Sequence, residues 1–542
     1  MRRAALPGLA LGLILLAPFA MRVLASAGGP GVAAGGAVET LVILTPHNES
    51  IRYEFTRAFR AHMAARGRAV AIDWRTPGGT SEITRYLASE YAASFRRHWT
   101  HDLGRPWSAA IGAGFSGAAN DHPAEEVAAA RRAFLSSNVG CGVDLLFGGG
   151  PELAKHAQAG RLVDAGLVAR HRELFGAGGI PRDLGGETTW DRDGRWYGTC
   201  LSTFGICYNR GALKRLGVTT PPSTWSALAT PTFAGEVALA DPTKSGAANT
   251  AFEAIVQHEM NLALERARAG GERDPVALDH LATGQGWAAA MRLIRRIGAN
   301  ARYFTDSAAK IPLDVSMGDG AAGMCIDFFG RFQREYSLAQ GHGERVGFAA
   351  ARGETWFNAD PIGLLRGAPH RDLAIAFMEF VLSDAGQKVW SFRRGAPGGP
   401  ETYALGRLPI SPRLYDHAFD RERLDPDENP YAPKEGVAPL VYRAPWTRPL
   451  FAALALVVRT MCVEPDAELH EAWTALVAAH FPPRATAAFD DVSSVDYATV
   501  SGPLRAALQS SDPLDEAAWT IRLVEQHRAL YGRVAALARA GQ

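Results

Sequence analysis

The sequence predicts an α/β protein in which helices alternate with the strands of a mainly parallel sheet. Leu41–Leu44 is a continuous apolar run, typical of a strand buried on both faces. Ile51, Phe55 and Phe59 then recur at four-residue spacing, as on one face of a helix. A second strand, Val70–Trp74, is again followed by a loop and a helix. This repeated order places the functional loops at the carboxyl ends of the strands.

Later segments continue the alternation, and two regions depart from it. We expect further strands at 143–147, 237–240, 323–327, 346–350 and 362–365. A surface insertion at about 92–139, rich in Trp, His, Gly and Pro, precedes the third strand. From about 440 the pattern is helical to the end. The apolar run Phe451–Val458 has only eight residues, which predicts a core helix and no membrane span.

The composition narrows the possible functions. The 542 residues include 57 Lys and Arg and 56 Asp and Glu, giving a net charge of +1, which argues against a nucleic-acid binder or a polybasic membrane-surface protein. A mean hydropathy of −0.07 excludes a polytopic membrane protein. The five cysteines form no CxxC pair, so we expect neither a thiolate zinc site nor a disulfide-dense scaffold.

Residues 1–27 have the pattern of an export signal. Arg2 and Arg3 precede the 14-residue uncharged run Leu6–Phe19, and Ala25–Ala27 offers a small-x-small cleavage site. The run is short of the roughly 20 residues that cross a bilayer. We therefore predict a periplasmic protein with a flexible leader at 28–37. The alternative is an uncleaved N-terminal segment that tethers the protein.

Three segments have residues suited to a polar or anionic ligand. Two lie where a strand gives way to a helix, whose N-terminal N–H groups and dipole favour negative charge. One lies on a long strand-like run. The candidates are Gly79, Thr80 and Ser81 in the first, Lys244, Ser245 and Gly246 in the second, and Ser202 and Thr203 in the third. Ordinary helix capping, or bonding of the local backbone, is the structural alternative for each.

Several segments together resemble the periplasmic solute-binding proteins of ABC importers, in the branch that includes ferric-iron receptors. Their order and spacing agree over about residues 38–415. The matching segments are Gly205–Asn209, Pro222–Trp225, Pro231–Phe233, Ala240–Gly246, Asp360–Ile362 and Ala376–Gln387.

The resemblance implies a two-lobed fold with two crossover hinge strands, a ligand cleft between the lobes, and an ABC permease and ATPase as partners. The sequence offers 198–205 and 346–360 as the crossings. We expect lobe one at 38–200, including the insertion, and lobe two at 203–350. The chain would return to lobe one at 352–440 and end in a helical extension at 441–542.

Four more residues are ligand candidates. Thr45 and His47 close the first strand, where the family places its first ligand loop. Asp144 and Asp327 each lie in an otherwise apolar predicted strand, and a carboxylate there needs a partner. A ligand ammonium or a metal is one possibility. The alternatives are a capped surface position for His47, and a backbone N–H or an arginine such as Arg331 for the two carboxylates.

The resemblance also allows a test for iron. Ferric receptors of this branch carry adjacent tyrosines, whose phenolates suit a hard cation. The matching residues here are Phe328 and Phe329, which cannot ligate. We therefore expect a phosphonate, sugar phosphate or carboxylate, with no cofactor and no metal. The alternatives are a ferric receptor, a ligand-presenting sensor and an extracytoplasmic enzyme. No hydrolase or nucleotide-binding motif is present, so we expect a non-enzymatic monomer that binds no nucleic acid.

Overall fold

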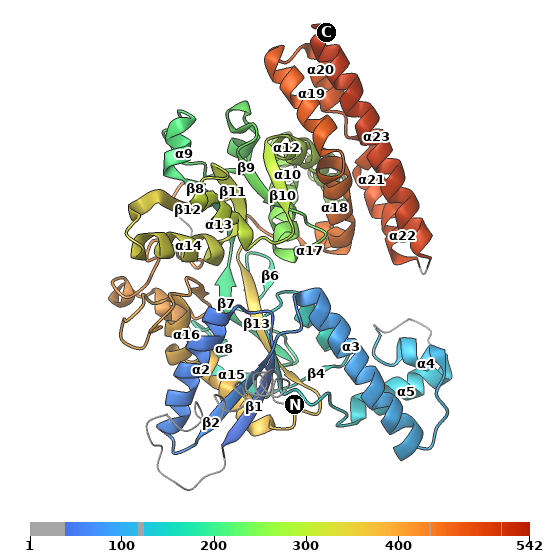
Figure 1. Cartoon of the computed structure of the whole chain (residues 1–542). Coiled ribbons are helices and arrows are strands. Elements are labelled where there is room, and N and C mark those ends of the chain that lie inside the picture. The colour runs from blue at the N-terminus through green and yellow to red at the C-terminus, as the bar shows by residue number, and fades with distance from the viewer. Residues whose placement is uncertain (1–37, 118–123, 433–434, 511) are drawn as a thin grey trace, which may run out of the picture.

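Two β-sheets organise the protein, one in the lower and one in the upper half of Figure 1. The computed structural model describes residues 38–117, 124–432, 435–510 and 512–542. The predicted signal (1–27) and leader (28–37) lie outside the described residues. The predicted fold class is confirmed: both sheets are covered by helices, two strands cross between them, and helices follow at the C-terminal end.

The first sheet has the strand order β14-β7-β13-β3-β1-β2, and β4 pairs with β13. Its strands are β1 (Glu39–Leu44), β2 (Val70–Arg75), β3 (Leu145–Phe147), β4 (Leu162–Val163), β7 (Trp196–Ser202), β13 (Asn358–Leu365) and β14 (Leu408–Pro409). The main helices around it are α2 (Glu49–Ala64), α3 (Thr80–Arg97), α6 (Glu152–Gln158), α15 (Arg371–Leu382) and α16 (Asp384–Ser391). Phe55 and Phe59, which the four-residue spacing placed on one helix face, are fully buried against Phe377 of α15.

The second sheet has the order β10-β9-β11-β8-β12. Its strands are β8 (Phe204–Asn209), β9 (Val237–Ala240), β10 (Ala301–Thr305), β11 (Ala322–Ile326) and β12 (Val346–Ala350). Its helices are α9 (Arg210–Arg215), α10 (Gly246–Ala269), α11 (Pro275–Leu281), α12 (Trp287–Ala299), α13 (Lys310–Met317) and α14 (Asp327–Ala339). A small hairpin, β5 (Asp183–Leu184) with β6 (Glu187–Thr188), lies outside both sheets.

Two crossings join the sheets. Only Thr203 separates the end of β7 from the start of β8. The chain returns between β12 and β13, through residues 351–357. We refer to the two halves below as lobe one, around the first sheet, and lobe two, around the second.

The strand register decides which edges of the two sheets face each other. In lobe one, β13 is antiparallel to β7 and to β3, so β3 ends on the same side as β7, where the chain crosses. β1 and β2 run parallel to β3 and end there too. In lobe two, β11 is antiparallel to β8 and parallel to β9, so both end beside the start of β8. The loops after β1, β2, β3, β9 and β11 therefore all lie on the crossing side.

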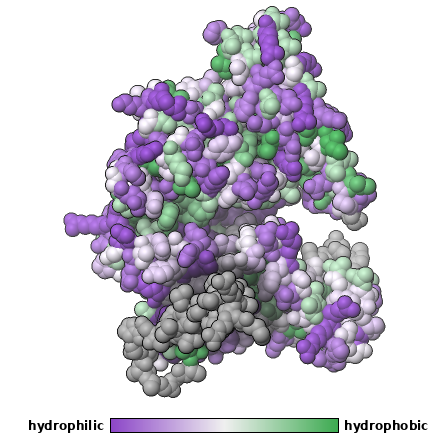
Figure 2. Space-filling model, in the orientation of Figure 1, coloured by the Kyte–Doolittle hydropathy of each residue, from purple (hydrophilic) through white to green (hydrophobic). Residues whose placement is uncertain are grey.

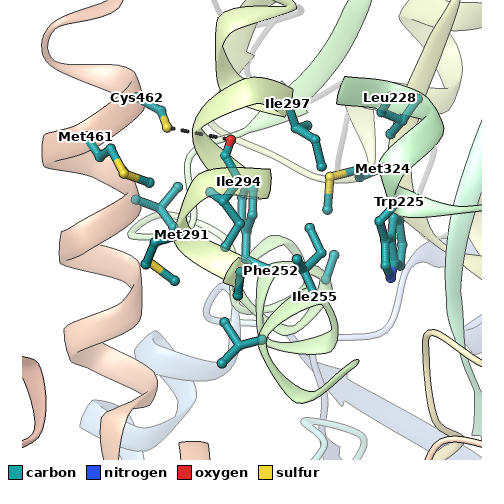
Figure 3. Close-up of a cluster of buried hydrophobic side chains, with 14 of the residues drawn as sticks. Trp225, Leu228, Phe252, Ile255, Met291, Ile294, Ile297, Met324, Met461 and Cys462 are labelled. Carbon is teal, nitrogen blue, oxygen red and sulfur yellow. Dashed lines mark hydrogen bonds between the residues drawn. The ribbon is translucent and has the colours of Figure 1, made fainter. Parts of the chain in front are cut away.

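The C-terminal helices pack on lobe two. They comprise α17 (Ala444–Thr447), α18 (Phe451–Val458), α19 (Asp466–Ala478), α20 (Pro483–Phe489), α21 (Tyr497–Thr499), α22 (Arg505–Gln509) and α23 (Pro513–Arg539). Figure 3 shows Met461 and Cys462 against Met291 and Ile294 of α12. The indole of Trp287 donates to the carbonyl of Val495 at 2.7 Å. The extension and lobe two thus share one continuous core.

One helical stretch among the described residues, Ala444–Val463, is long and apolar enough to cross a membrane by length and composition. Its most apolar window is 67% buried inside the protein. This burial is the environment of a core helix, as predicted for Phe451–Val458.

The insertion lengthens lobe one at its outer end (Figure 1). A π-helical turn, η1 (His98–Asp102), continues α3, and α4 (Ala109–Gly114) and α5 (Glu125–Ser136) pack beside it. Phe95, Phe115 and Phe134 form its aromatic core.

Leu469→Ala should lower the free energy of unfolding by about 2 to 5 kcal/mol, because Leu469 is fully buried between the extension and lobe two. Urea denaturation followed by tryptophan fluorescence measures the loss. Glu471→Ala, at an exposed ion pair with Arg539, is the control and should cost less than about 1 kcal/mol. Equal effects of the two changes would contradict a shared core.

Candidate ligand site

Three loops of lobe one meet at its crossing-side edge. Gly148, Gly149 and Gly150 follow β3 with φ of 88°, 104° and 56°, the left-handed region that favours glycine. The backbone passes close to both neighbouring loops there. A Cβ at Gly148 would lie 2.7 Å from the His47 Nε2, and one at Gly149 would lie 3.6 Å from the Thr80 methyl group. The loops after β1, β2 and β3 therefore form one surface.

A buried charged network lies beneath these glycines. The Asp360 carboxylate, at the start of β13, accepts a hydrogen bond from the Arg407 guanidinium. The same oxygen lies 2.9 Å from the His47 Nε2. The second Asp360 oxygen accepts from the Gly150 N–H at 3.4 Å. One carboxylate therefore fixes a histidine, an arginine and the glycine loop.

The electrostatics of this network are set by burial. Burial alone would raise the pKa of Asp360, but the charge of Arg407 and the hydrogen bond with His47 outweigh it and hold that pKa well below its ordinary value. Burial lowers the pKa of His47, only partly offset by Asp360, so the imidazole is neutral at pH 7. Because an ionised carboxylate can only accept, the His47 proton sits on Nε2 and Nδ1 is left as an acceptor. Among the described residues, the buried Nδ1 has no partner.

Arg407 also joins the two lobes. Its guanidinium carbon lies 4.0 Å from the ring centroid of Phe328, in the first turn of α14 in lobe two. It lies 5.5 Å from the Trp390 ring and donates to the Cys200 sulfur at 3.1 Å. Burial raises the pKa of the Cys200 thiol to about 12, so the thiol stays protonated. A fixed positive charge is thereby placed at the junction of the lobes.

The Gly79–Ser81 segment begins α3 as the sequence predicted. Gly79 is the cap residue and offers no side chain to the helix end. The Glu82 side chain folds back over Gly78, where a Cβ would lie 2.7 Å from its Cγ. Its carboxylate also pairs with Arg85 at 2.7 Å. A ligand anion at this helix end would therefore share it with Glu82.

In lobe two, Lys244, Ser245 and Gly246 link β9 to α10. The Ser245 hydroxyl accepts from the Ala248 N–H at 3.3 Å, which is the capping role. The Lys244 ammonium is 62% exposed and 3.9 Å from Asp241. Because Asp241 is distant and is the one partner of Lys244 among the described residues, the ammonium group can contact a ligand.

The hydroxyls of Ser202 and Thr203, at the crossing between the lobes, differ in their hydrogen bonds. The Thr203 hydroxyl donates to the Trp356 carbonyl at 3.2 Å, linking the outgoing and returning segments. The Ser202 hydroxyl is buried and has no partner in the part of the chain that the structure describes. The Thr45 hydroxyl donates to the Phe147 carbonyl at 2.6 Å and so ties β1 to β3.

The prediction that Asp144 and Asp327 lie within strands is wrong, because Asp144 precedes β3 and Asp327 is the first residue of α14. Both carboxylates have protein partners. Asp144 accepts from the backbone N–H groups of Val42 at 2.9 Å and His370 at 2.6 Å, and it precedes β3, away from the loops. Asp327 pairs with Arg331, the alternative that the sequence offered. Arg331 also forms an ion pair with Asp425.

Sequence reasoning missed Asp360 and Arg407 as site residues. Asp360 was visible only as part of a motif, although a carboxylate before Pro361 in an apolar strand could have marked it. Arg407 had no local signal, because its partners Cys200 and Asp360 lie 207 and 47 residues away.

Comparisons with known proteins cover part of the chain. Residues 149–403 match the family model of the bacterial extracellular solute-binding proteins, which confirms the predicted resemblance over that segment. An uncharacterised protein of Haemophilus influenzae is 23% identical over 189 residues, 35% of this chain. The chain spans 45% of the length of that curated relative.

Solved structures resemble the chain at low identity. The periplasmic binding protein AfuA of Actinobacillus pleuropneumoniae, bound to fructose 6-phosphate, is 17% identical over 65% of this chain and 82% of its own, with a TM-score of 0.38. Iron-bound HitA of Pseudomonas aeruginosa is 14% identical over 73% and 91%, with a TM-score of 0.41.

Asp360→Asn should lower the free energy of unfolding at pH 7 by about 3 to 5 kcal/mol, because Arg407 would stay buried without its carboxylate. Because the pKa of Asp360 is lower in the folded protein than in the unfolded chain, where it is about 3.9, the ionised carboxylate stabilises the fold above that pH. This stabilisation is lost progressively as the pH falls below that value. The difference from wild type should therefore shrink between pH 5 and pH 3. Urea titrations at both values measure it.

Asp193→Asn is the matched control, since Asp193 is 66% exposed in its ion pair with Arg195. It should change stability by less than about 1 kcal/mol at either pH. A pH-independent loss for Asp360→Asn would show that the charge of the carboxylate is not what stabilises the network.

Proposed function

We propose that this chain is the extracytoplasmic solute-binding component of an ABC importer and captures a small polar anion between its lobes. The family matched by residues 149–403 consists of binding proteins, which supports a non-enzymatic role. The observation that carries the proposal is that the candidate loops of both sheets follow strands that end on the crossing side. An anion is the ligand that the charges on these loops favour.

Three positive features support an anion. The N-termini of α3 and α10 each provide about half a positive charge, and Lys244 adds a full one. Two nearby carboxylates oppose them, but Glu82 is paired with Arg85, and Asp241 accepts from the Thr243 hydroxyl. The exposed Lys244 is therefore the residue whose charge is most available to a ligand.

The surroundings of Phe328 favour an anion over a bare ferric ion. The Phe328 ring lies over the Arg407 guanidinium, and its neighbour Phe329 provides no oxygen donor. A trivalent cation beside a fixed guanidinium would be repelled, and the phenolates that could offset this repulsion are missing. A sensor role would use the same site and differs only in the membrane partner.

Lys244→Ala and Thr80→Ala should each weaken binding of the ligand. A charge-assisted hydrogen bond is worth about 1.5 to 3 kcal/mol, so Lys244→Ala should raise Kd about ten- to a hundredfold. A thermal-shift screen of sugar phosphates, phosphonates, carboxylates and ferric citrate finds the ligand, and calorimetry measures its affinity. Lys214→Ala, in α9 at the opposite edge of the lobe-two sheet, removes the same charge as a control.

Two results would contradict the anion site. One is unchanged affinity in both site variants. The other is a response in the screen to ferric ion alone, with no response to any organic anion.

Ligand should also bring the lobes together, because a cleft whose two walls both contact the ligand is most stable when closed. Small-angle X-ray scattering should give a smaller radius of gyration at saturating ligand. The control is the same scattering titration of the Lys244→Ala variant, at a ligand concentration too low to occupy the weakened site of that variant. An identical curve with and without bound ligand would contradict closure.

A further inference from the structure

The insertion has an open pocket on its surface, which we call the cavity below. This cavity has a volume of about 820 Å³ and lies at the outer end of lobe one. Every residue that lines it falls between Ser94 and Gly140. That range coincides with the predicted insertion and lies outside residues 149–403, which match the solute-binding family. None of these lining residues is among the candidates for the ligand site between the lobes, so the cavity is a separate feature.

The walls of the cavity are held in place by hydrogen bonds. On one side, the Trp99 indole donates to the Pro106 carbonyl at 2.9 Å and fixes the loop after η1. On the other side, Arg366 of lobe one donates to the carbonyls of Leu135 at 2.8 Å and Ser137 at 3.0 Å. The end of α5 is thus attached to the main body of the lobe. The cavity has a defined shape before any ligand arrives.

The lining carries a positive charge. It includes Arg97, Arg105 and Arg132, and Asp102 is its one acidic residue. The Arg105 guanidinium lies 4.9 Å from the Trp99 ring centroid, which holds it in position. Within the described residues, neither Arg97 nor Arg105 pairs with a carboxylate, and Arg132 meets Glu125 only at 3.5 Å on the surface.

The helix ends reduce this charge without cancelling it. α3 and α5 both direct their C-termini towards the cavity, and each contributes about half a negative charge. Three arginines, one aspartate and two helix ends leave about one positive charge. Arginines are common at helix C-termini, because their charge offsets the negative end of the helix dipole. The two dipoles here offset the charge of only about one of the three arginines.

Neutral hydrogen-bond donors complete the lining. Ser94 contributes a hydroxyl and Asn138 an amide, whereas the hydroxyls of Ser136 and Ser137 donate to backbone carbonyls of α5. Guanidinium groups together with hydroxyls are the donors that bind phosphate oxygens, because guanidinium can bind two of them at once.

We propose that the cavity of residues 94–140 is a second binding site, which takes a phosphate group carried by a small organic molecule or by an anionic lipid headgroup. It is separate from the cleft between the lobes. α3 begins at the cleft with Thr80 and reaches the cavity with Arg97, and its 18 residues span about 27 Å. A ligand of ordinary size cannot occupy both sites.

The test uses the full mature chain with glycerol 3-phosphate in solution and, separately, vesicles of phosphatidylglycerol or phosphatidylcholine. Calorimetry measures the first and vesicle flotation the second. The variants are Arg97→Gln, Arg105→Gln and their combination. Arg60→Gln, on the exposed face of α2, removes the same charge elsewhere in lobe one. Thermal melting confirms that each variant is folded, as expected for exposed side chains.

A soluble phosphate site predicts binding of glycerol 3-phosphate that is weakened about tenfold by each cavity variant, unchanged by Arg60→Gln and reduced by added salt. A headgroup site predicts flotation with phosphatidylglycerol only, lost in the double variant. Binding to neither probe, or binding that Arg60→Gln weakens as much as Arg97→Gln, would overturn the proposal. Lys244→Ala should leave this binding unchanged, which separates it from the cleft.

Discussion

Only Thr203 separates β7 from β8, and this short crossing decides which edge of each sheet can receive a ligand. A one-residue link leaves no room for a strand to turn back, so β7 must end where β8 begins. The register then brings the ends of β1, β2 and β3 to face those of β9 and β11. A helix is the next element of the chain after each of these five strands. The concentration of candidate polar residues on one side of each sheet therefore follows from the topology.

The parts that the sequence could predict are those encoded by neighbouring residues. Strands such as Leu41–Leu44 and helix faces such as Phe55 and Phe59 reveal themselves by apolar spacing, and Gly79–Ser81 by its turn residues. The network of Asp360, Arg407 and His47 could not be found in this way, because it joins three strand ends that are distant in the chain. The pair of Asp327 and Arg331 is local by contrast, because the two residues lie four positions apart on α14.

The Asp360 network also explains how a buried arginine can lie beside a ligand site at acceptable cost. An isolated guanidinium would be expensive to bury, but Arg407 has a carboxylate, a sulfur and two aromatic faces around it. The same carboxylate holds the Gly150 N–H, so the glycine loop depends on the charge state of Asp360. The position of Arg407 and the shape of the glycine loop at the edge of lobe one therefore both depend on Asp360.

The C-terminal extension adds mass to lobe two without blocking a relative motion of the lobes, because its contacts with lobe one lie beside the crossing. The Tyr442 N–H donates to the Gly185 carbonyl at 2.8 Å, and Arg448 pairs with Glu187 of β6 at 3.1 Å. Tyr442 also stacks on Trp356 of the returning segment, with ring centroids 4.5 Å apart. A rotation about the crossing displaces residues near the axis least. In the closure proposed above, the extension would move with lobe two, because the side of the molecule away from these contacts is open (Figure 2).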